Sequence, residues 1–145
     1  MNMNELRDLC VDRFPLSTTR PLITKGFEAV ATELYHDDIK GEIWVNGSFV
    51  TEKMNPEDVD FVLRVPAEVY DNGSKSQRKR IDWLANDLKT QYHCDSYCFM
   101  EWPENHPNYW FGQYMHSYWM KQFGFSRRNE MKGIAVIALP GGIIQ

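Results

Sequence analysis

Apolar residues recur along the chain in patterns that predict a short series of helices and strands. Between residues 21 and 36 they return at steps of three and four, which is typical of a helix with one buried face. Pro21 suits the first turn of that helix, because its φ angle is fixed and it lacks an N–H. Short runs of β-branched and aromatic residues predict strands at 42–45, 59–65, 92–100 and 133–139.

The remaining stretches predict two more helices and several connections. Residues 74–90 have a helical pattern with a basic start, and residues 113–123 predict a short aromatic helix. We expect a polar lead-in or loops at residues 1–20, 66–74 and 103–112. This alternation predicts an α/β (α+β) fold, with helices packed on a small mixed sheet. The length, 145 residues, predicts one domain spanning 1–145.

Composition and charge exclude several classes of protein. The chain has 16 Lys and Arg against 20 Asp and Glu, a net charge of −4, which argues against a general nucleic-acid binder. This charge is still compatible with a local basic patch, or with a nucleotide ligand that carries its own metal counter-ions. The longest apolar stretch, Ile134 to Leu139, is too short to cross a membrane. Three cysteines and a start without a secretory pattern predict a cytoplasmic protein with reduced thiols.

Candidate chemistry gathers where the first two predicted strands meet a connecting turn. Strand 42–45 runs into Gly47-Ser48, and Asp58 and Asp60 follow at the entrance of the next strand. Because side chains alternate along a strand, the two aspartates point the same way. Adjacent carboxylates repel each other unless a cation lies between them, and Mg²⁺ prefers oxygen ligands. Asp95 joins this group if its strand lies beside strand 59–65.

The turn itself suggests a phosphate site. Gly47 leaves room for a phosphate close to the backbone, and Ser48 adds a hydroxyl. Lys53 supplies a positive charge in the same turn. We therefore expect Gly47, Ser48 and Lys53 to bind a nucleotide.

This pattern resembles the nucleotidyltransferase superfamily that shares the DNA polymerase beta catalytic core, in which a Gly-Ser is followed by D-x-D and a later carboxylate. More closely, the stretches GEIWVNGSFVTEK, NPEDVDFVL and HCDSYCF resemble a family of small, uncharacterised bacterial nucleotidyltransferase-like proteins. The resemblance implies that Asp58, Asp60 and Asp95 are catalytic and hold Mg²⁺, or Mn²⁺. It also implies a two-metal mechanism that transfers a nucleoside monophosphate from a nucleoside triphosphate to a hydroxyl on a protein, an RNA end or a small molecule.

Other interpretations stay open beside this one. Asp95 can be a structural hydrogen-bonding residue, and cysteines near it are better buried apolar groups than zinc ligands. An aromatic C-terminal third favours a non-catalytic nucleotidyltransferase-like interaction module, for example one half of a toxin–antitoxin or phage-defence pair. A basic cluster, usually a solvated helix face, would instead serve a nucleic-acid-processing enzyme. The cluster comprises Lys75, Arg78, Lys79 and Arg80.

Overall fold

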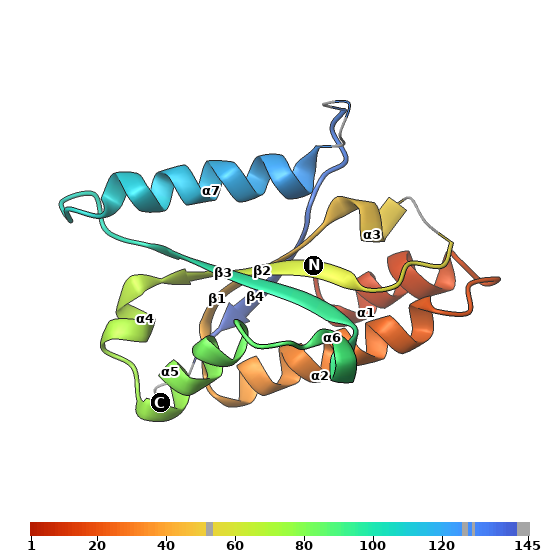
Figure 1. Cartoon of the computed structure of the whole chain (residues 1–145), viewed down its shortest axis with the longest axis horizontal. Helices are drawn as coiled ribbons and strands as arrows, with labels where there is room; N and C mark the ends of the chain where they lie inside the picture. The colour runs from red at the N-terminus through yellow and green to blue at the C-terminus, as the bar shows by residue number, and fades with distance from the viewer. Residues whose placement is uncertain (52–53, 126–127, 129, 142–145) are drawn as a thin grey trace.

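A four-stranded mixed sheet forms the centre of the molecule (Figure 1). The computed structural model describes residues 1–51, 54–125, 128 and 130–141. Strand order is β3-β2-β1-β4, with bounds Lys40–Val45 for β1, Val59–Pro66 for β2, Cys94–Glu101 for β3 and Ala135–Pro140 for β4. β1 pairs antiparallel with β2 and β4, whereas β2 and β3 run parallel. The predicted α+β fold with a mixed sheet is confirmed.

Helices cover the two faces of this sheet unequally. One face carries the main core and packs against α1 (Met3–Arg7), α2 (Arg20–His36), α5 (Lys75–Trp83) and α6 (Lys89–Tyr92). The other face is covered by α7 (Tyr109–Gly124) (Figure 1). A smaller core lies between α7 and the sheet, made of Trp44, Val62, Phe99 and Phe123. No helix of the described residues is long and apolar enough to span a membrane.

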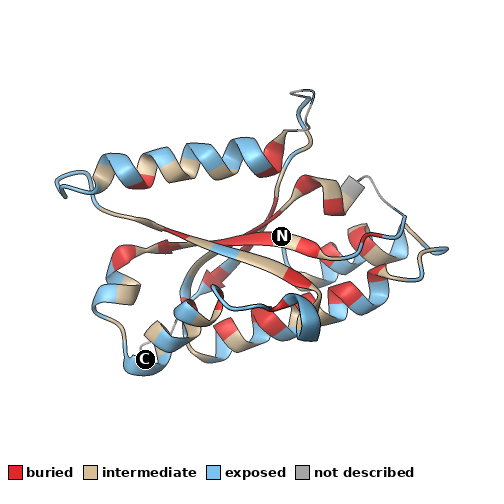
Figure 2. Cartoon of the chain, viewed as in Figure 1, coloured by how far each residue is buried: buried red, intermediate tan, exposed pale blue. Residues whose placement is uncertain are grey.

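Side chains of β2 alternate between the main core and the α7 side of the sheet. Val59, Phe61 and Leu63 of β2 are fully buried in the main core, and Val62 between them belongs to the smaller one. Figure 2 shows buried residues following the strands and the inner sides of the helices below them, while most of α7 is exposed or half-buried. Residues of β2 that do not face the main core therefore lie on the α7 side.

The prediction of a polar lead-in at residues 1–20 is wrong. This segment holds α1 and a π-helical turn, η1 (Asp8–Asp12), and it buries Leu6 and Cys10 completely. The guanidinium of Arg20 is also fully buried and donates to the backbone carbonyls of Cys10 and Phe49. A few apolar residues in a polar sequence thus anchor the segment, which composition alone did not indicate.

Helix boundaries differ from the predicted ones where tertiary packing turns the chain. The predicted helix 74–90 is interrupted: α5 ends at Trp83 and α6 begins at Lys89, because Leu84 and Leu88 turn into the main core between them. A further short helix, α4 (Ala67–Asp71), occupies part of the predicted loop 66–74. Helix α7 begins earlier than expected, at Tyr109.

The three cysteines pack as apolar groups. Cys10 and Cys94 are buried and Cys98 is half-buried, and all three are free thiols. Burial raises the pKa of Cys10 to about 11 and of Cys94 and Cys98 to about 12. They are therefore neutral and unreactive at physiological pH.

Candidate active site

Strand pairing brings the predicted carboxylates together. The parallel register of β2 and β3 places Asp60 directly opposite Asp95. Asp58 lies two residues before Asp60, and Val59 between them points into the main core. All three aspartates therefore lie on the α7 side of the sheet. This confirms that the strand of Asp95 neighbours the strand that follows Asp58.

The three carboxylates act on one another electrostatically. Burial and, after it, the charges of Asp58 and Asp95 together raise the pKa of Asp60 from 3.8 to about 6. Nearby Lys89 and a hydrogen bond with the Asn46 side chain oppose that rise. The ionised form of Asp60 is thus unfavourable in this protein without a bound cation.

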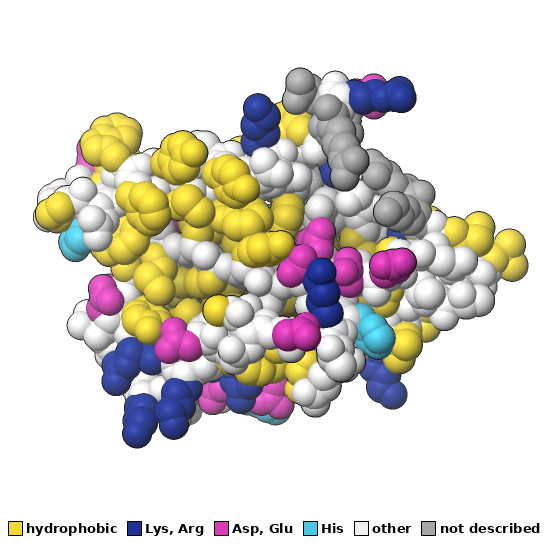
Figure 3. Space-filling view, viewed as in Figure 1, with side chains coloured by type: hydrophobic (Ala, Val, Ile, Leu, Met, Phe, Trp, Pro, Cys, Tyr) yellow, Lys and Arg dark blue, Asp and Glu magenta, His cyan; other side chains and the backbone are white. Residues whose placement is uncertain are grey.

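A lysine that the sequence pattern did not single out neutralises part of this charge. The Nζ atom of Lys89 lies 3.8 Å from Oδ2 of Asp58 and 3.6 Å from Oδ2 of Asp95. These carboxylates, Asp95 first, raise the pKa of the lysine. Figure 3 shows acidic side chains gathered around a basic one on this face of the molecule. Because the pattern of residues 74–90 predicts one continuous helix, nothing in it indicates that Lys89 reaches the carboxylates.

The donor chemistry of this cluster fits a hard divalent cation, although the side chains do not converge on one. Within the described residues, no group of three or more His, Cys, Asp or Glu side chains is arranged to hold a metal ion. Three carboxylates on one face supply only oxygen donors, which Mg²⁺ and Mn²⁺ prefer. The ammonium of Lys89 now lies near two of them, so a cation would have to displace it.

The Gly47-Ser48 turn forms a short helix, α3 (Gly47–Thr51), beside the carboxylates. Oδ1 of Asn46 accepts hydrogen bonds from the backbone N–H and the hydroxyl of Ser48, at 3.0 and 2.9 Å. The same oxygen lies 3.4 Å from Nζ of Lys132, and the Asn46 N–H donates to the carbonyl of Asp60. Asn46 therefore joins the serine, a lysine and the β2 carboxylate strand. In the sequence, only its position directly before Gly47 indicates that Asn46 belongs to the site.

Glycine at position 47 has a packing reason. A Cβ atom there would lie 2.2 Å from the carbonyl oxygen of Gly133 and 3.0 Å from Cβ of Lys132. The missing side chain thus allows the segment after α7 to approach α3. A phosphate role for Gly47 stays a prediction. Lys53, the third residue of the predicted nucleotide site, lies outside the described residues.

Two hollows meet at the carboxylates and share no residue. A polar hollow of about 290 Å³ lies beside α3 and includes Ser48, Asp58 and Asp60. A larger, mostly apolar hollow of about 650 Å³ follows the outer edge of β3 between α5 and α7, and it includes Asp95. Its aromatic walls are Tyr97, Phe99, Trp102, Phe111 and Trp119. A charged ligand group and an apolar one can thus lie on opposite sides of the aspartates.

Tyr97 connects the apolar hollow to the carboxylates. Its hydroxyl donates to Oδ2 of Asp95 at 3.0 Å, and its ring lies 4.7 Å from that of Trp119. The indole Nε1 of Trp119 is buried and has no hydrogen-bond partner among the described residues. Asp95 and Tyr97 therefore share one strand face, as the alternation along β3 predicts.

The outer surface of α7 is strongly apolar. Large side chains are exposed along it, from Trp110 with 78% exposure to Tyr118 with 42%. Figure 3 shows hydrophobic side chains clustered over this helix and the hollow beside it. Phe99 and Phe123 lie in the smaller core, whereas Trp110, Tyr114 and Tyr118 are exposed. Apolar surface of this extent often marks a protein-binding site.

Half of the basic cluster at the start of α5 is engaged within the chain. Arg80 forms ion pairs with Glu33 at 3.0 Å and Asp37 at 2.5 Å, and its guanidinium packs over Trp83. Arg78 donates to the carbonyl of Gly73. These contacts hold α5 and its cap in place, which weakens the case that the cluster binds a nucleic-acid backbone.

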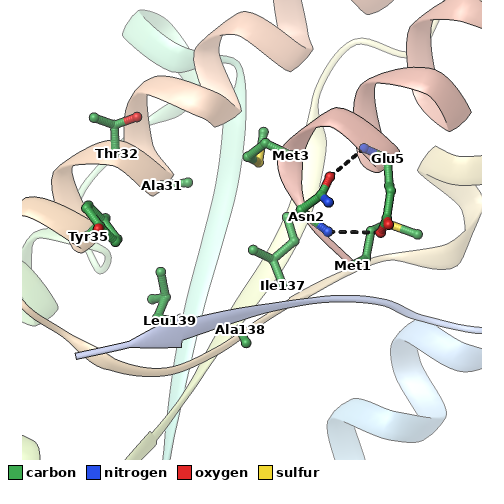
Figure 4. A pocket seen from close by; sticks show the side chains of 10 residues that line it. All are labelled: Met1, Asn2, Met3, Glu5, Ala31, Thr32, Tyr35, Ile137, Ala138 and Leu139. Atoms are coloured by element: carbon green, nitrogen blue, oxygen red, sulfur yellow. Dashed lines mark hydrogen bonds between the residues drawn. The ribbon is translucent and has the colours of Figure 1, made fainter. Parts of the chain in front are cut away.

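A third hollow lies far from the aspartates, at the opposite edge of the sheet. It measures about 620 Å³ and lies between α1, α2 and β4 (Figure 4). Its one ionisable carboxylate, Glu5, accepts a hydrogen bond from the backbone N–H of Asn2 in the helix cap. The other side chains that line it include Met3, Ala31 and Leu139. Among the described residues that line it, this hollow holds a single carboxylate, in contrast to the group of Asp58, Asp60 and Asp95.

Comparison with known proteins assigns a family but no activity. No curated protein and no solved structure matches the chain. One family model matches residues 1–138, nearly the whole length, and it describes a family of unknown function, DUF6932. The chain therefore belongs to the DUF6932 family.

Proposed function

We propose that this protein is a metal-dependent nucleotidyltransferase that moves a nucleoside monophosphate from a nucleoside triphosphate to a hydroxyl acceptor. The observation that most supports this proposal is the position of Asp58, Asp60 and Asp95 on one sheet face. There the charges of Asp58 and Asp95 help to raise the pKa of Asp60. Such a group of carboxylates is costly without a cation, and it lies beside a polar hollow that contains Ser48. Perturbed ionisable groups in a hollow are typical of functional sites.

Each residue has a distinct part in this proposal. Asp58, Asp60 and Asp95 would hold Mg²⁺ or Mn²⁺, which when bound neutralises phosphate charge and stabilises the entering and leaving oxygens. Asp95 lies on the edge strand β3, on the side of the site where the acceptor hydroxyl would bind. Ser48, whose hydroxyl donates to Asn46 in this structure, would turn toward a phosphate oxygen of the nucleotide.

Lysines complete the charge balance of the same site. Lys132 approaches Asn46 within 3.4 Å and so places a positive charge next to Ser48. Lys89 neutralises Asp58 and Asp95 in the protein without a cation. We expect Lys89 to leave this position when a divalent ion binds, because the ammonium and the ion repel each other at such short distance.

Turnover with the four nucleoside triphosphates tests the proposal. The purified protein is incubated with each triphosphate and Mg²⁺ or Mn²⁺, and pyrophosphate release is measured. We expect release that Asp58→Asn and Asp60→Asn reduce by at least ~10²-fold, since each removes a charge that a bound cation needs. Asp71→Asn, an exposed aspartate at the end of α4, is the control and keeps full turnover. Release that is equal in all four proteins would refute the site assignment.

A second candidate function rests on the exposed aromatic face of α7. In this reading the protein is a non-catalytic interaction module that binds a partner protein through side chains such as Trp110 and Tyr114. It predicts partner binding that needs neither nucleotide nor the aspartates. Trp110→Ala would weaken that binding, whereas Asp58→Asn would leave it unchanged. Robust turnover that depends on the aspartates would refute a purely non-catalytic role.

A further inference from the structure

We infer that Tyr97 is an acceptor of the nucleotidyl group, so that the protein modifies its own β3 strand. This inference rests on the proposed function, because it names the hydroxyl that the same carboxylates would serve. It starts from a geometric observation: the phenol oxygen of Tyr97 lies 3.0 Å from Oδ2 of Asp95. Within the described part of the chain, no other tyrosine has a recorded hydrogen bond to one of the three aspartates.

Strand geometry fixes this hydroxyl at the carboxylates. Tyr97 follows Asp95 by two residues on β3, so both side chains lie on the α7 face. The parallel register puts Asp60 opposite Asp95 and Val62 opposite Tyr97, so the phenol lies over the same two strands as the aspartates. The ring packs against Trp119 at 4.7 Å, which restricts its orientation. A nucleophile held in this way needs little further ordering to attack.

The Tyr97 side chain is also partly exposed. Tyr97 is 38% exposed and lines the apolar hollow, whereas Ser48 lines the polar hollow on the other side of the aspartates. In phosphoryl transfer the attacking and leaving oxygens lie roughly in line. If the triphosphate lies in the polar hollow, its leaving pyrophosphate is directed away from Tyr97.

The proposed step balances without a further reactant. The Oη atom of Tyr97 forms a bond to the α-phosphorus of the bound triphosphate. The bond between the α-phosphorus and the bridging oxygen breaks, and pyrophosphate leaves with its electron pair. The phenolic proton passes to the carboxylate of Asp95, which already accepts it in a hydrogen bond, and then to solvent. The product is a phosphodiester between Tyr97 and the nucleoside.

Mass spectrometry of the full chain tests this inference. The protein is incubated with each triphosphate and Mg²⁺ or Mn²⁺, and its intact mass and proteolytic peptides are measured. We expect a gain of one nucleoside monophosphate, located on Tyr97 and lost in Tyr97→Phe. Tyr70→Phe is a matched control, because the Tyr70 hydroxyl also donates to an aspartate, Asp82, at 3.0 Å but lies away from the site. Its mass gain should equal that of the unaltered chain.

Two further measurements separate failure of this inference from failure of the proposed function. Calorimetry of the unaltered chain with Mg²⁺ and triphosphate reports binding independently of any transfer. Binding without a mass gain, or a gain on a residue other than Tyr97, overturns the inference and leaves the proposed function standing. Absence of metal-dependent binding overturns both. Thermal unfolding of Tyr97→Phe shows whether the variant is folded, and peptide mapping of the unaltered chain identifies the modified residue without any variant.

Discussion

Replacing Asp60 by asparagine should stabilise the protein at neutral pH. In the folded protein, burial and two neighbouring carboxylates raise the pKa of Asp60 from 3.8 to about 6. Its ionised form at pH 7 is therefore less favourable in the folded than in the unfolded chain. One pKa unit corresponds to about 1.4 kcal/mol, which sets an upper limit of about 3 kcal/mol for this cost. Because Asp60 is only half-buried and solvent screens it, we expect a gain of ~1–2 kcal/mol in Asp60→Asn.

The gain in stability of Asp60→Asn should depend on pH in a defined direction. A raised folded pKa contributes stability below the unfolded value of 3.8, and that stability is lost as the pH rises through about 6. The advantage of Asp60→Asn should thus be small near pH 4, grow between pH 4 and 6, and stay constant above pH 7.

Urea unfolding at several pH values, without divalent cations, measures this advantage directly. Asp71→Asn, on an exposed position, should change the free energy of unfolding by less than ~0.5 kcal/mol at every pH. The reasoning on the carboxylate cluster would be refuted if Asp60→Asn were less stable than the unaltered chain at pH 7. It would also be refuted if the gain in stability were the same at every pH.

Three other perturbations have defined outcomes. Gly47→Ala places a Cβ atom 2.2 Å from the Gly133 carbonyl and should lower the free energy of unfolding by ~1–3 kcal/mol in urea denaturation. Arg20→Met leaves buried carbonyls, including that of Phe49, without their donor, and thermal unfolding should show a loss of at least ~2 kcal/mol. Burial raises the pKa of Cys98 to about 12, so native protein at pH 8 should react with iodoacetamide far more slowly than urea-unfolded protein.

Regular patterns made much of the fold predictable. Helix α2 and the four strands follow clear apolar periods, so their type and approximate bounds came from the sequence. The start of the chain did not, because Leu6 and Cys10 lie in a short, mostly polar segment and their burial depends on contacts with α2 and the sheet. The break between α5 and α6 has a similar cause. Leu84 and Leu88 enter the main core there, although the local pattern continues a helix.

For the candidate site too, local sequence patterns predict one part, whereas tertiary contacts determine the rest. The shared face of Asp58 and Asp60 follows from alternation along a strand, and it required no knowledge of packing. Adjacency to Asp95 needed the order of strands, which the structure provides. Lys89 reaches the carboxylates only because the chain turns after α5, and Asn46 and Lys132 meet only because the segment after α7 packs on Gly47. Such long-range contacts leave no periodic trace in the sequence.

Metal-dependent binding of a nucleoside triphosphate tests the central claim most directly. Calorimetric titration of the full chain with each triphosphate, with and without Mg²⁺, measures it before any acceptor is known. We expect binding of at least one triphosphate that requires Mg²⁺ and that the double variant Asp58→Asn/Asp60→Asn abolishes. Asp71→Asn should bind as the unaltered chain does. Binding that is absent with all four triphosphates, or unaffected by Mg²⁺ and by the double variant, would contradict the account.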